Sequence, residues 1–287
     1  MEIMISYFQA IILGLLQGFS ELFPISSLGH SVIFPALVGW HINQKAPELL
    51  TFLVATHAAT AITLFLFFWK DWVRIIKGIF VSLREREIKG TDAKLGWLLL
   101  VGTIPGGILG VLFQDQIQSL FASPNIVALI LAGNGVLLFG AELLRRKRLL
   151  SVQTSVGSDE RIARLTWTQA FGVGLAQAIA LIPGLSRTGS ALSGGLLVGL
   201  SHEDAARFAF LLATPIIGGA ALLKLPNLFS TQQAILGESV VGAICAAITA
   251  YFSVKFLVKY FQKDTLVPFA IYCLIAGVIS SLILFLR

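Results

Sequence analysis

The sequence predicts an all-α polytopic membrane protein, with about six transmembrane helices and two re-entrant helical hairpins arranged as an inverted-topology repeat. Three observations support this fold class. Hydrophobic residues make up 56% of the 287 residues and charged residues only 13%, whereas a soluble domain carries about 25% charged residues. The apolar residues form long runs rather than short alternating segments, which favours helices over a β-barrel. A polar motif in the first half also returns in the second half.

The first element is a pair of short apolar runs with a polar break between them. Residues 7–23 and 31–39 are apolar, but each is shorter than the roughly 20 residues that a crossing requires. Two half-helices that meet at residues 24–29 and turn back explain this pattern better than one kinked and tilted span. Broken backbone at membrane depth is tolerated where protein buries it or where it lines a cavity.

Three full-length spans are expected next, and the second half repeats the whole order. The second half begins with a short pair, about 167–182 and 190–200, around a PGLSRTG break. The six expected spans are about 49–69, 96–113, 124–144, 206–224, 237–258 and 266–286.

Two matched blocks at nearly constant offset indicate an internal repeat. GLAQ at 174–177 echoes GLLQ at 14–17, and FLLAT at 210–214 echoes FLVAT at 52–56. We therefore expect one membrane domain over residues 1–287. It consists of repeat 1 at about 7–144, a flexible cytoplasmic linker at about 145–166, and repeat 2 at about 167–287.

The distribution of basic residues predicts the topology. If each broken pair returns to its own side, each half crosses three times, and the two copies enter the membrane from opposite faces. The net charge of +6 lies almost wholly in the loops 70–95 and 145–166. Two crossings separate these loops, so they share a side, which the positive-inside rule makes cytoplasmic. Both termini and the first broken pair then face the outer side. This charge pattern reflects topology and lipid attraction, and no nucleic-acid binding is expected.

The first break carries reactive groups. Glu21 lies in an apolar run, where a carboxylate costs about 2.5–3.5 kcal/mol on insertion scales, so a functional role is the default interpretation. Ser27 is a candidate nucleophile, and His30 is its base or the acid for the leaving group. Glu21 is a base, a partner of His30 or a metal ligand, and direct attack by His30 or by an activated water stays open. Ser26 has the alternative role of a helix cap. His57 is interpreted as a packing residue.

The second break predicts an anion site. Pro183 and Gly184 end one helix, and Gly189 permits close backbone approach before the next begins. Arg187 supplies a permanent charge suited to phosphate or carboxylate, next to the hydroxyls of Ser186, Thr188 and Ser190. The alternative is that Arg187 is a lipid-headgroup anchor, but its place within a Gly/Ser/Thr break favours anion binding.

Together these motifs, QGFSELFPISSLGH and PGLSRTG, resemble the two signature motifs of the membrane-embedded undecaprenyl-diphosphate phosphatases, the bacitracin-resistance proteins. The resemblance covers most of the chain. It implies that Glu21, Ser27, His30 and Arg187 are catalytic and that Glu21 is a possible metal ligand. The substrate-binding residues that we expect are Gln17, Ser26, Gly184, Ser186, Thr188 and Gly189.

The function implied by this resemblance is hydrolysis of undecaprenyl diphosphate to undecaprenyl phosphate and phosphate. It also implies recycling of the lipid carrier for peptidoglycan synthesis, bacitracin resistance, and a divalent cation, Mg²⁺ or Ca²⁺. A homodimer is expected in the bacterial cytoplasmic (inner) membrane, with membrane lipids as partners and an active site open to the outer side.

Three departures from the family pattern bear on these expectations. Gln17 stands where many members have Glu, which removes a possible metal ligand. Thr188 replaces the usual serine, and Tyr272-Cys273 stands where members often have Tyr-Arg. The alternative function is a transporter or flippase of a lipid-linked phosphate, since inverted repeats with broken helices are typical of transporters. Such a carrier needs Arg187 and Glu21 but not the Ser27/His30 pair.

Overall fold

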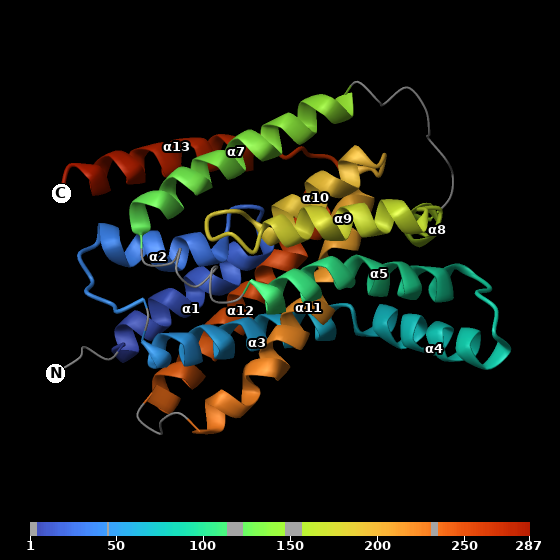
Figure 1. Ribbon diagram of the computed structural model, residues 1–287, viewed down its shortest axis with the longest axis horizontal. Coiled ribbons are helices and arrows are strands. Elements are labelled where there is room, and N and C mark those ends of the chain that lie inside the picture. The colour runs from blue at the N-terminus through green and yellow to red at the C-terminus, as the bar shows by residue number, and fades with distance from the viewer. Residues whose placement is uncertain (1–4, 45, 114–122, 147–156, 231–234) are drawn as a thin grey trace.

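The computed structural model describes residues 5–44, 46–113, 123–146, 157–230 and 235–287, and within these ranges the chain forms helices and no strand. Figure 1 shows the helices as one elongated bundle. In chain order they are α1 (Tyr7–Leu22), α2 (Ser27–Leu37), α3 (Pro47–Phe67), α4 (Trp69–Glu85), α5 (Thr91–Leu112), α7 (Pro124–Arg146), α8 (Ser158–Ala163), α9 (Trp167–Ile179), α10 (Arg187–Leu197), α11 (His202–Ser230), α12 (Leu236–Tyr260) and α13 (Val267–Phe285).

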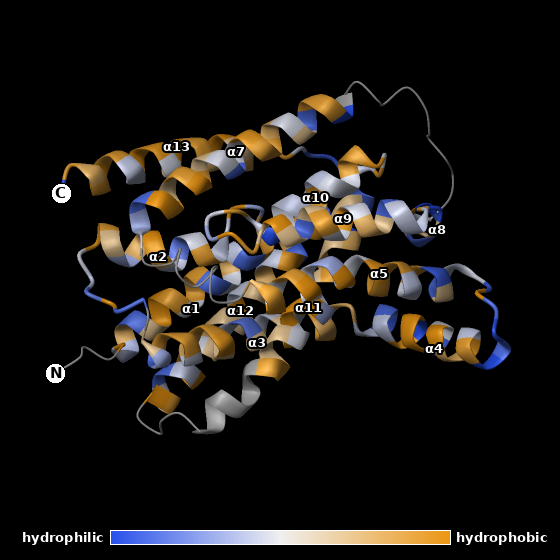
Figure 2. Cartoon of the chain, in the orientation of Figure 1, coloured by the Kyte–Doolittle hydropathy of each residue, from blue (hydrophilic) through white to orange (hydrophobic). Residues whose placement is uncertain are grey.

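The prediction of six membrane spans is confirmed. Helices α3, α5, α7, α11, α12 and α13 are each long and apolar enough to cross a membrane. Figure 2 shows apolar residues along these helices, whereas hydrophilic residues gather at one end, on the α4–α5 connection and on α8. This is the distribution expected of a bundle whose middle lies in lipid and whose charged end lies in water.

The charged segment 70–95, expected as a loop, is mostly helical, because α4 covers it as far as Glu85 and α5 begins at Thr91. Its apolar side packs on α5: Ile75 is buried, and Ile79 lies against Gly96. Because apolar residues recur every three to four positions among the charges, the segment forms an amphipathic helix rather than an irregular loop. The charges that predicted a water-exposed segment occupy the other face.

The expected linker is partly helical as well. Residues 147–156 lie outside the described ranges, but α8 follows them and ties the charged ends of the two halves together. Asp159 on α8 is 3.0 Å from Arg74 on α4 and 2.6 Å from Arg207 on α11. Arg74 also pairs with Asp71 at 2.6 Å.

The two pairs of short helices are built by the same local devices. Ser6 caps α1 in a reciprocal capping box with Gln9, and Thr166 caps α9 in the same way with Gln169. The hydroxyls of Ser26 and Ser186 each accept a 3.1 Å hydrogen bond from the backbone N–H three residues later and so cap α2 and α10.

Each short pair doubles back on itself, and the two tips meet near the middle of the bundle (Figure 1). Helix α1 runs opposite to α9, and α7 runs opposite to α13, as an inverted repeat requires (Figure 1). The spans are exchanged between the halves, because α1 packs mainly on α12 while α9 packs mainly on α5. Since no bilayer is present, the re-entrant position of the hairpins in a membrane stays a prediction.

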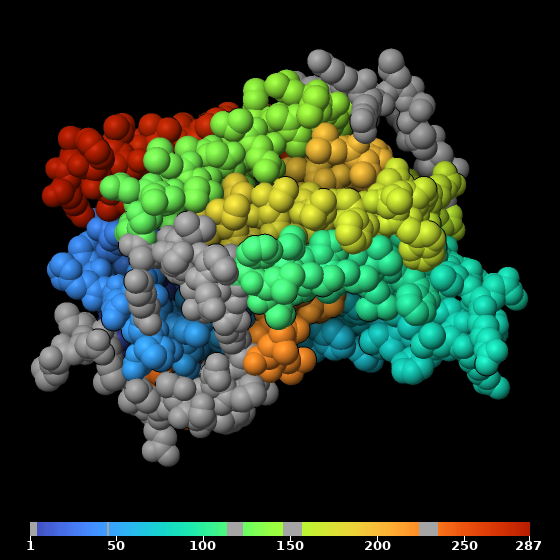
Figure 3. All heavy atoms as spheres, in the orientation of Figure 1, coloured from blue at the N-terminus to red at the C-terminus, as the bar shows by residue number. Residues whose placement is uncertain are grey.

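Both exchanged contacts depend on facing glycines. A methyl group on Gly14 would lie 2.4 Å from the carbonyl oxygen of Gly242, and one on Gly174 would lie 2.1 Å from that of Gly102. No side chain fits at such distances, so the backbones approach as closely as small-residue packing in membranes permits. Along the other edge of the bundle, α7 and α13 lie side by side (Figure 3).

Candidate active site

The tips of the two hairpins touch through hydrogen bonds that involve buried side chains. Thr188 donates from Oγ1 to the carbonyl oxygen of Glu21 at 2.9 Å. Asn134 on α7 donates from Nδ2 to the carbonyl oxygen of Pro24 at 3.0 Å and accepts from the N–H of Ser186 at 3.0 Å. One carboxamide therefore bonds to both tips. In the sequence, the matching motifs of the two halves suggest that the two breaks share a site. In the structure, hydrogen bonds join the two breaks directly.

Glu21 is the acceptor on which the site converges. Its side chain is buried, and Oε2 accepts hydrogen bonds from Gln17 Nε2 at 2.9 Å and from the hydroxyl of Ser27. His57 Nε2 is 3.2 Å from the same oxygen, and Arg187 Nη2 is 3.5 Å from Oε1. These donors and charges replace the water that a buried carboxylate loses, and burial without them would be costly.

Ser27 is the first residue of α2, and its hydroxyl points at Glu21 rather than at His30. The hydroxyl group of a serine becomes a nucleophile when a neighbouring base takes its proton. In this arrangement the acceptor in contact with the hydroxyl is the carboxylate. Ser26, one residue before it, has φ of +70°, a strained conformation for a residue other than glycine. The tip that presents Ser27 is therefore held in a conformation that costs free energy.

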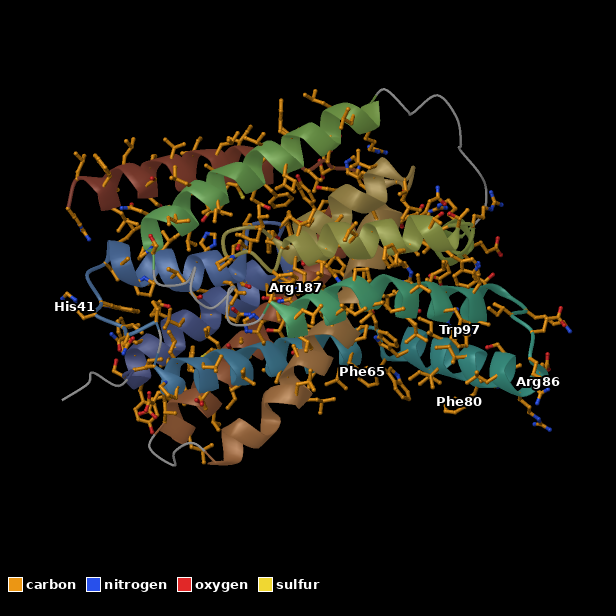
Figure 4. All side chains as sticks on the ribbon, viewed as in Figure 1. His41, Phe65, Phe80, Arg86, Trp97 and Arg187 are labelled. Carbon is orange, nitrogen blue, oxygen red and sulfur yellow. The ribbon has the colours of Figure 1, made fainter. Side chains whose placement is uncertain are left out.

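The place where the tip of the α1–α2 hairpin meets the tip of the α9–α10 hairpin is called the junction. Arg187, the first residue of α10, and Ser27 line the same cavity there. Figure 4 places Arg187 near the middle of the molecule, far from Arg86 and His41 at the two ends. The N-termini of α2 and α10 both lie at the junction, so their unpaired N–H groups and positive dipole ends are available to one anion. Gly184, with φ of +101°, allows the turn that aims α10 this way.

His30 is bonded away from Ser27. Its Nδ1 is 2.7 Å from the carbonyl oxygen of Ser26, and its Nε2 is 2.7 Å from the hydroxyl of Tyr272 on α13. The imidazole and phenol rings are nearly parallel, with 12° between their planes. His30 thus belongs to the same tip as Ser27 but faces the α13 side of the junction.

Sequence reasoning missed three residues around the junction. The interpretation of His57 as packing is corrected, because its Nε2 contacts Glu21 while its Nδ1 bonds to the carbonyl of Leu53. Asn134 is a polar residue in an apolar span, which is in itself a signal of function. In the sequence, Tyr272 stands out only as part of the Tyr272-Cys273 departure from the family pattern. His57 directly follows the FLVAT block that repeats, which was the signal available in the sequence.

The space at the junction is small. A cavity of about 10 Å³ lies among residues that include Glu21, Ser27, Ser186 and Arg187. A cavity of that size holds about one water molecule. This cavity among the described residues is smaller than a diphosphate group, so binding of that group requires the side chains that line it to move.

The donor set does not fit a divalent cation held by the protein alone. Among the described residues there is no group of three or more His, Cys, Asp and Glu side chains that would hold a metal. Glu21 is the carboxylate at the junction, and its Oε2 already contacts Gln17, Ser27 and His57. Mg²⁺ and Ca²⁺ require several oxygen ligands, and the amide of Gln17 presents its N–H to Glu21.

Comparison with known proteins gives a consistent result. A family model described as "Bacitracin resistance protein BacA" matches residues 10–279. The chain is 44% identical, over 99% of both chains, to an undecaprenyl-diphosphatase of Mycolicibacterium paratuberculosis. It is 45% identical, over 93% of both chains, to undecaprenyl-diphosphatase 2 of Burkholderia orbicola. It is 42% identical to an undecaprenyl-diphosphatase of Acidiphilium cryptum, over 96% of this chain and 97% of the relative.

Proposed function

The chain belongs to the bacitracin resistance protein BacA family, and from that premise we infer that it is an undecaprenyl-diphosphatase. It is an integral membrane phosphatase that hydrolyses undecaprenyl diphosphate to undecaprenyl phosphate and phosphate. The reaction recycles the lipid carrier, and bacitracin resistance is the association of the family. The resemblance seen in the two sequence motifs is thereby confirmed.

One observation carries the assignment of the site. The hydroxyl of Ser27 bonds to Glu21 while Arg187 contacts the other oxygen of that carboxylate, at a junction of two helix N-termini. A nucleophile, a proton acceptor and a fixed cation therefore meet where an anion would be stabilised. Arg187 and the helix ends would stabilise the charge that grows on the equatorial oxygens of the transferred phosphoryl group.

We propose that Ser27 Oγ attacks the terminal phosphorus and that the P–O bond to the prenyl monophosphate breaks. The hydroxyl proton passes to Glu21, which returns it to the leaving monophosphate. Water then attacks the phosphoserine, and the P–O bond to Ser27 Oγ breaks. His30 Nε2 accepts a proton from the water, and this proton returns to Ser27 Oγ, so that inorganic phosphate is released and Ser27 is regenerated. The contact between Ser27 and Glu21 supports this division of roles, whereas the sequence motifs alone predict that His30 takes the serine proton.

We also propose that the remaining polar residues and glycines of the two tips bind the substrate, each on its own structural ground. Ser186, Thr188 and Gly189 begin α10 beside Arg187, and Gly184 forms the preceding turn. Gln17 orients Glu21, and Ser26 caps α2. Where a divalent cation is required, we propose that Mg²⁺ or Ca²⁺ arrives on the diphosphate rather than at a site formed by the protein.

We further propose that the protein lies in the bacterial inner membrane as a homodimer, with both termini and the active site facing outward. Helix α1 begins and α13 ends at the same end of the molecule, opposite the α4–α5 connection (Figure 1). At the end formed by that connection lie the basic residues Arg84, in the last turn of α4, and Arg86 and Lys89, in the connection itself. The positive-inside rule supports this orientation.

Phosphate release by the purified protein in detergent tests the proposal, with undecaprenyl and shorter prenyl diphosphates and with or without EDTA. Ser27→Ala should lower kcat by about 10³-fold or more, the scale on which losing a nucleophile acts. Ser193→Ala is the matched control, because it removes a buried hydroxyl from α10 outside the proposed machinery. Activity of Ser27→Ala near that of wild type would remove the nucleophile assignment. Tight binding without phosphate release by wild type would favour the alternative lipid-phosphate carrier.

A further inference from the structure

Both ring nitrogens of His30 are engaged, and their partners fix the tautomer. Nδ1 faces the carbonyl oxygen of Ser26 at 2.7 Å, and a carbonyl oxygen only accepts, so Nδ1 carries the hydrogen. In the neutral ring Nε2 is then an acceptor. The hydroxyl of Tyr272, 2.7 Å away, donates to it. The lone pair that would accept a proton in the reaction is therefore occupied by Tyr272.

Tyr272 stands between the junction and the lipid-facing surface. It is 42% exposed, whereas His30 is 9% exposed. Its neighbours on the outer side of α13, Ile271 and Ile275, are exposed and apolar, as expected of a helix in contact with lipid. Helix α13 packs mainly on α7 and makes few contacts with α2, which carries His30. Tyr272 therefore lies between Nε2 of His30 and the bilayer.

The small cavity at the junction bears on the contact between Tyr272 and His30. The cavity at Ser27 and Arg187 has room for about one water, so substrate binding requires the side chains that line it to move. The substrate is a lipid, and its prenyl chain remains in the bilayer while the diphosphate enters. A residue that bridges the lipid-facing helix and the site histidine is placed to move in that step.

We propose that Tyr272 is a positioning residue for the reaction. Its hydroxyl holds Nε2 of His30 in the resting site, and it releases this nitrogen when the diphosphate group arrives from the side of α13. The proposal deepens the proposed function and rests on it for the role of His30 in turnover. The contact between Tyr272 and His30 can nevertheless be tested without turnover.

The first test measures how fast diethyl pyrocarbonate modifies His30 in the purified full-length protein, with the modified residue located by peptide mass spectrometry. This reagent acylates unprotonated imidazole nitrogen, which in His30 is the nitrogen that Tyr272 occupies. Tyr272→Phe keeps the ring and removes the donor, so modification of His30 should accelerate about fivefold, as the loss of one net hydrogen bond predicts. Tyr272→Leu, which also lacks the donor, should accelerate modification by at least as much.

Tyr251→Phe is the matched control. Tyr251 lies on α12, is 45% exposed, and its ring contacts Phe67 and Phe252 rather than the junction. The rate for His30 in this variant should equal that of wild type. Equal rates in Tyr272→Phe, Tyr251→Phe and wild type would overturn the proposal, whether or not the protein hydrolyses prenyl diphosphates.

The second test asks whether Tyr272 acts only by holding His30 in the resting site or acts directly on the reacting atoms. Because the bond between Tyr272 and His30 must break before substrate is bound productively, Tyr272→Phe should lower KM by about two- to tenfold. Its kcat should remain within about twofold of wild type. A large fall in kcat with KM unchanged would make Tyr272 a group that acts on the reacting atoms, and would overturn the positioning role.

Discussion

The side-chain hydroxyl of Thr188 donates a 2.9 Å hydrogen bond to the backbone carbonyl oxygen of Glu21, across 167 residues of sequence. Both groups are buried. Glu21 lies at the last turn of α1, where carbonyl oxygens have no partner within the helix. One hydroxyl of the second repeat therefore supplies a bond that the first hairpin needs, and the position of Glu21 depends on the other half of the chain.

Removing that hydroxyl should loosen the junction. In Thr188→Val, which has the same shape, the carbonyl of Glu21 loses its donor, at a cost of about 1–3 kcal/mol for an unsatisfied buried group. We expect kcat to fall about tenfold or more and the melting temperature in detergent to decrease. Thr188→Ser keeps the hydroxyl and is the control. Equal activity of the Val and Ser variants would mean that the bond does not hold Glu21 in place.

Arg187 is expected to act through its fork of N–H donors as well as its charge. A lysine ammonium at this position is a point charge and cannot form a bidentate contact with a phosphoryl group. Arg187→Lys should therefore lower kcat/KM about 10²- to 10³-fold, the scale of losing a transition-state donor. Arg84→Lys on the exposed face of α4 is the control and should behave as wild type. A similar small effect in both variants would identify Arg187 as a lipid anchor.

Gln17 stands where many family members have Glu. We expect its side chain to serve as a hydrogen-bond donor to Glu21 and not as a metal ligand. In Gln17→Glu, two carboxylates would lie where Gln17 Nε2 now donates to Glu21 at 2.9 Å. Such a buried pair requires a proton or a cation between its members. We expect Mg²⁺ or Ca²⁺ to raise the melting temperature of this variant in the absence of substrate, and EDTA to reverse the effect.

The matched control for that experiment is Gln177→Glu, at the corresponding position of the second repeat. Leu181 stands there in place of Glu21, so the new carboxylate has no acidic partner at that position. The melting temperatures of this variant and of wild type should not respond to divalent cations or EDTA. A cation response in wild type without substrate would show that the protein itself holds a metal, contrary to the donor set around Glu21.

The sequence predicted the features that can be inferred from the order of residues along the chain, namely the spans and the internal repeat. Long apolar runs located the six spans, and the repeated motif indicated that Glu21 and Arg187 would share a site. The sequence did not predict which faces of distant helices meet. Tyr272 reaches His30 across 242 residues, and His57 reaches Glu21 from the side of α3. Both side chains lie in apolar spans, where a single residue gives no indication of the direction it faces.

The helix α4 illustrates a different limit. A segment rich in Lys, Arg, Asp and Glu was expected to be a loop because charge is typical of segments in water. Charge determines where a segment lies but not its secondary structure, and the apolar residues at helical spacing decided that instead. The same segment supplies Arg74 to the ion-pair cluster that joins α4, α8 and α11.

That cluster predicts a pH-dependent stability. Burial alone would raise the pKa of Asp159, but hydrogen bonds and charge from Arg207 and Arg74 outweigh it and leave this pKa below its usual range. A carboxyl whose pKa is lower in the folded state stabilises the fold above its unfolded pKa of about 3.9, and this contribution is lost as pH falls through its folded pKa. Asp159→Asn should therefore lower the melting temperature at pH 7 by about 2–6 °C.

Melting curves of detergent-solubilised protein between pH 7 and pH 3 measure this difference. The gap between wild type and Asp159→Asn should shrink as pH falls below about 4, because the carboxyl of the unfolded wild-type chain then binds a proton that the folded carboxyl, with its lower pKa, does not yet bind. Asp264→Asn, at an exposed position between α12 and α13, is the control and should show little gap at any pH. A gap for Asp159→Asn that stays constant down to pH 3 would contradict an ion-pair origin.

The orientation of the bundle predicts a labelling pattern. Arg86 and His41 lie at opposite ends of the molecule (Figure 4), so cysteines placed at these two ends should react from opposite sides of the membrane. With a membrane-impermeant maleimide, Glu87→Cys, next to Arg86, should react only from the cytoplasmic side, because its connection carries the basic residues. His41→Cys should react only from the outer side.

The parent chain controls for the native thiols Cys245 and Cys273, which lie within α12 and α13 and should remain unlabelled. The reversed pattern would place the basic connection outside and the tip of the first hairpin on a path from the cytoplasm. That result would also reverse the side on which Ser27 and Arg187 meet their substrate.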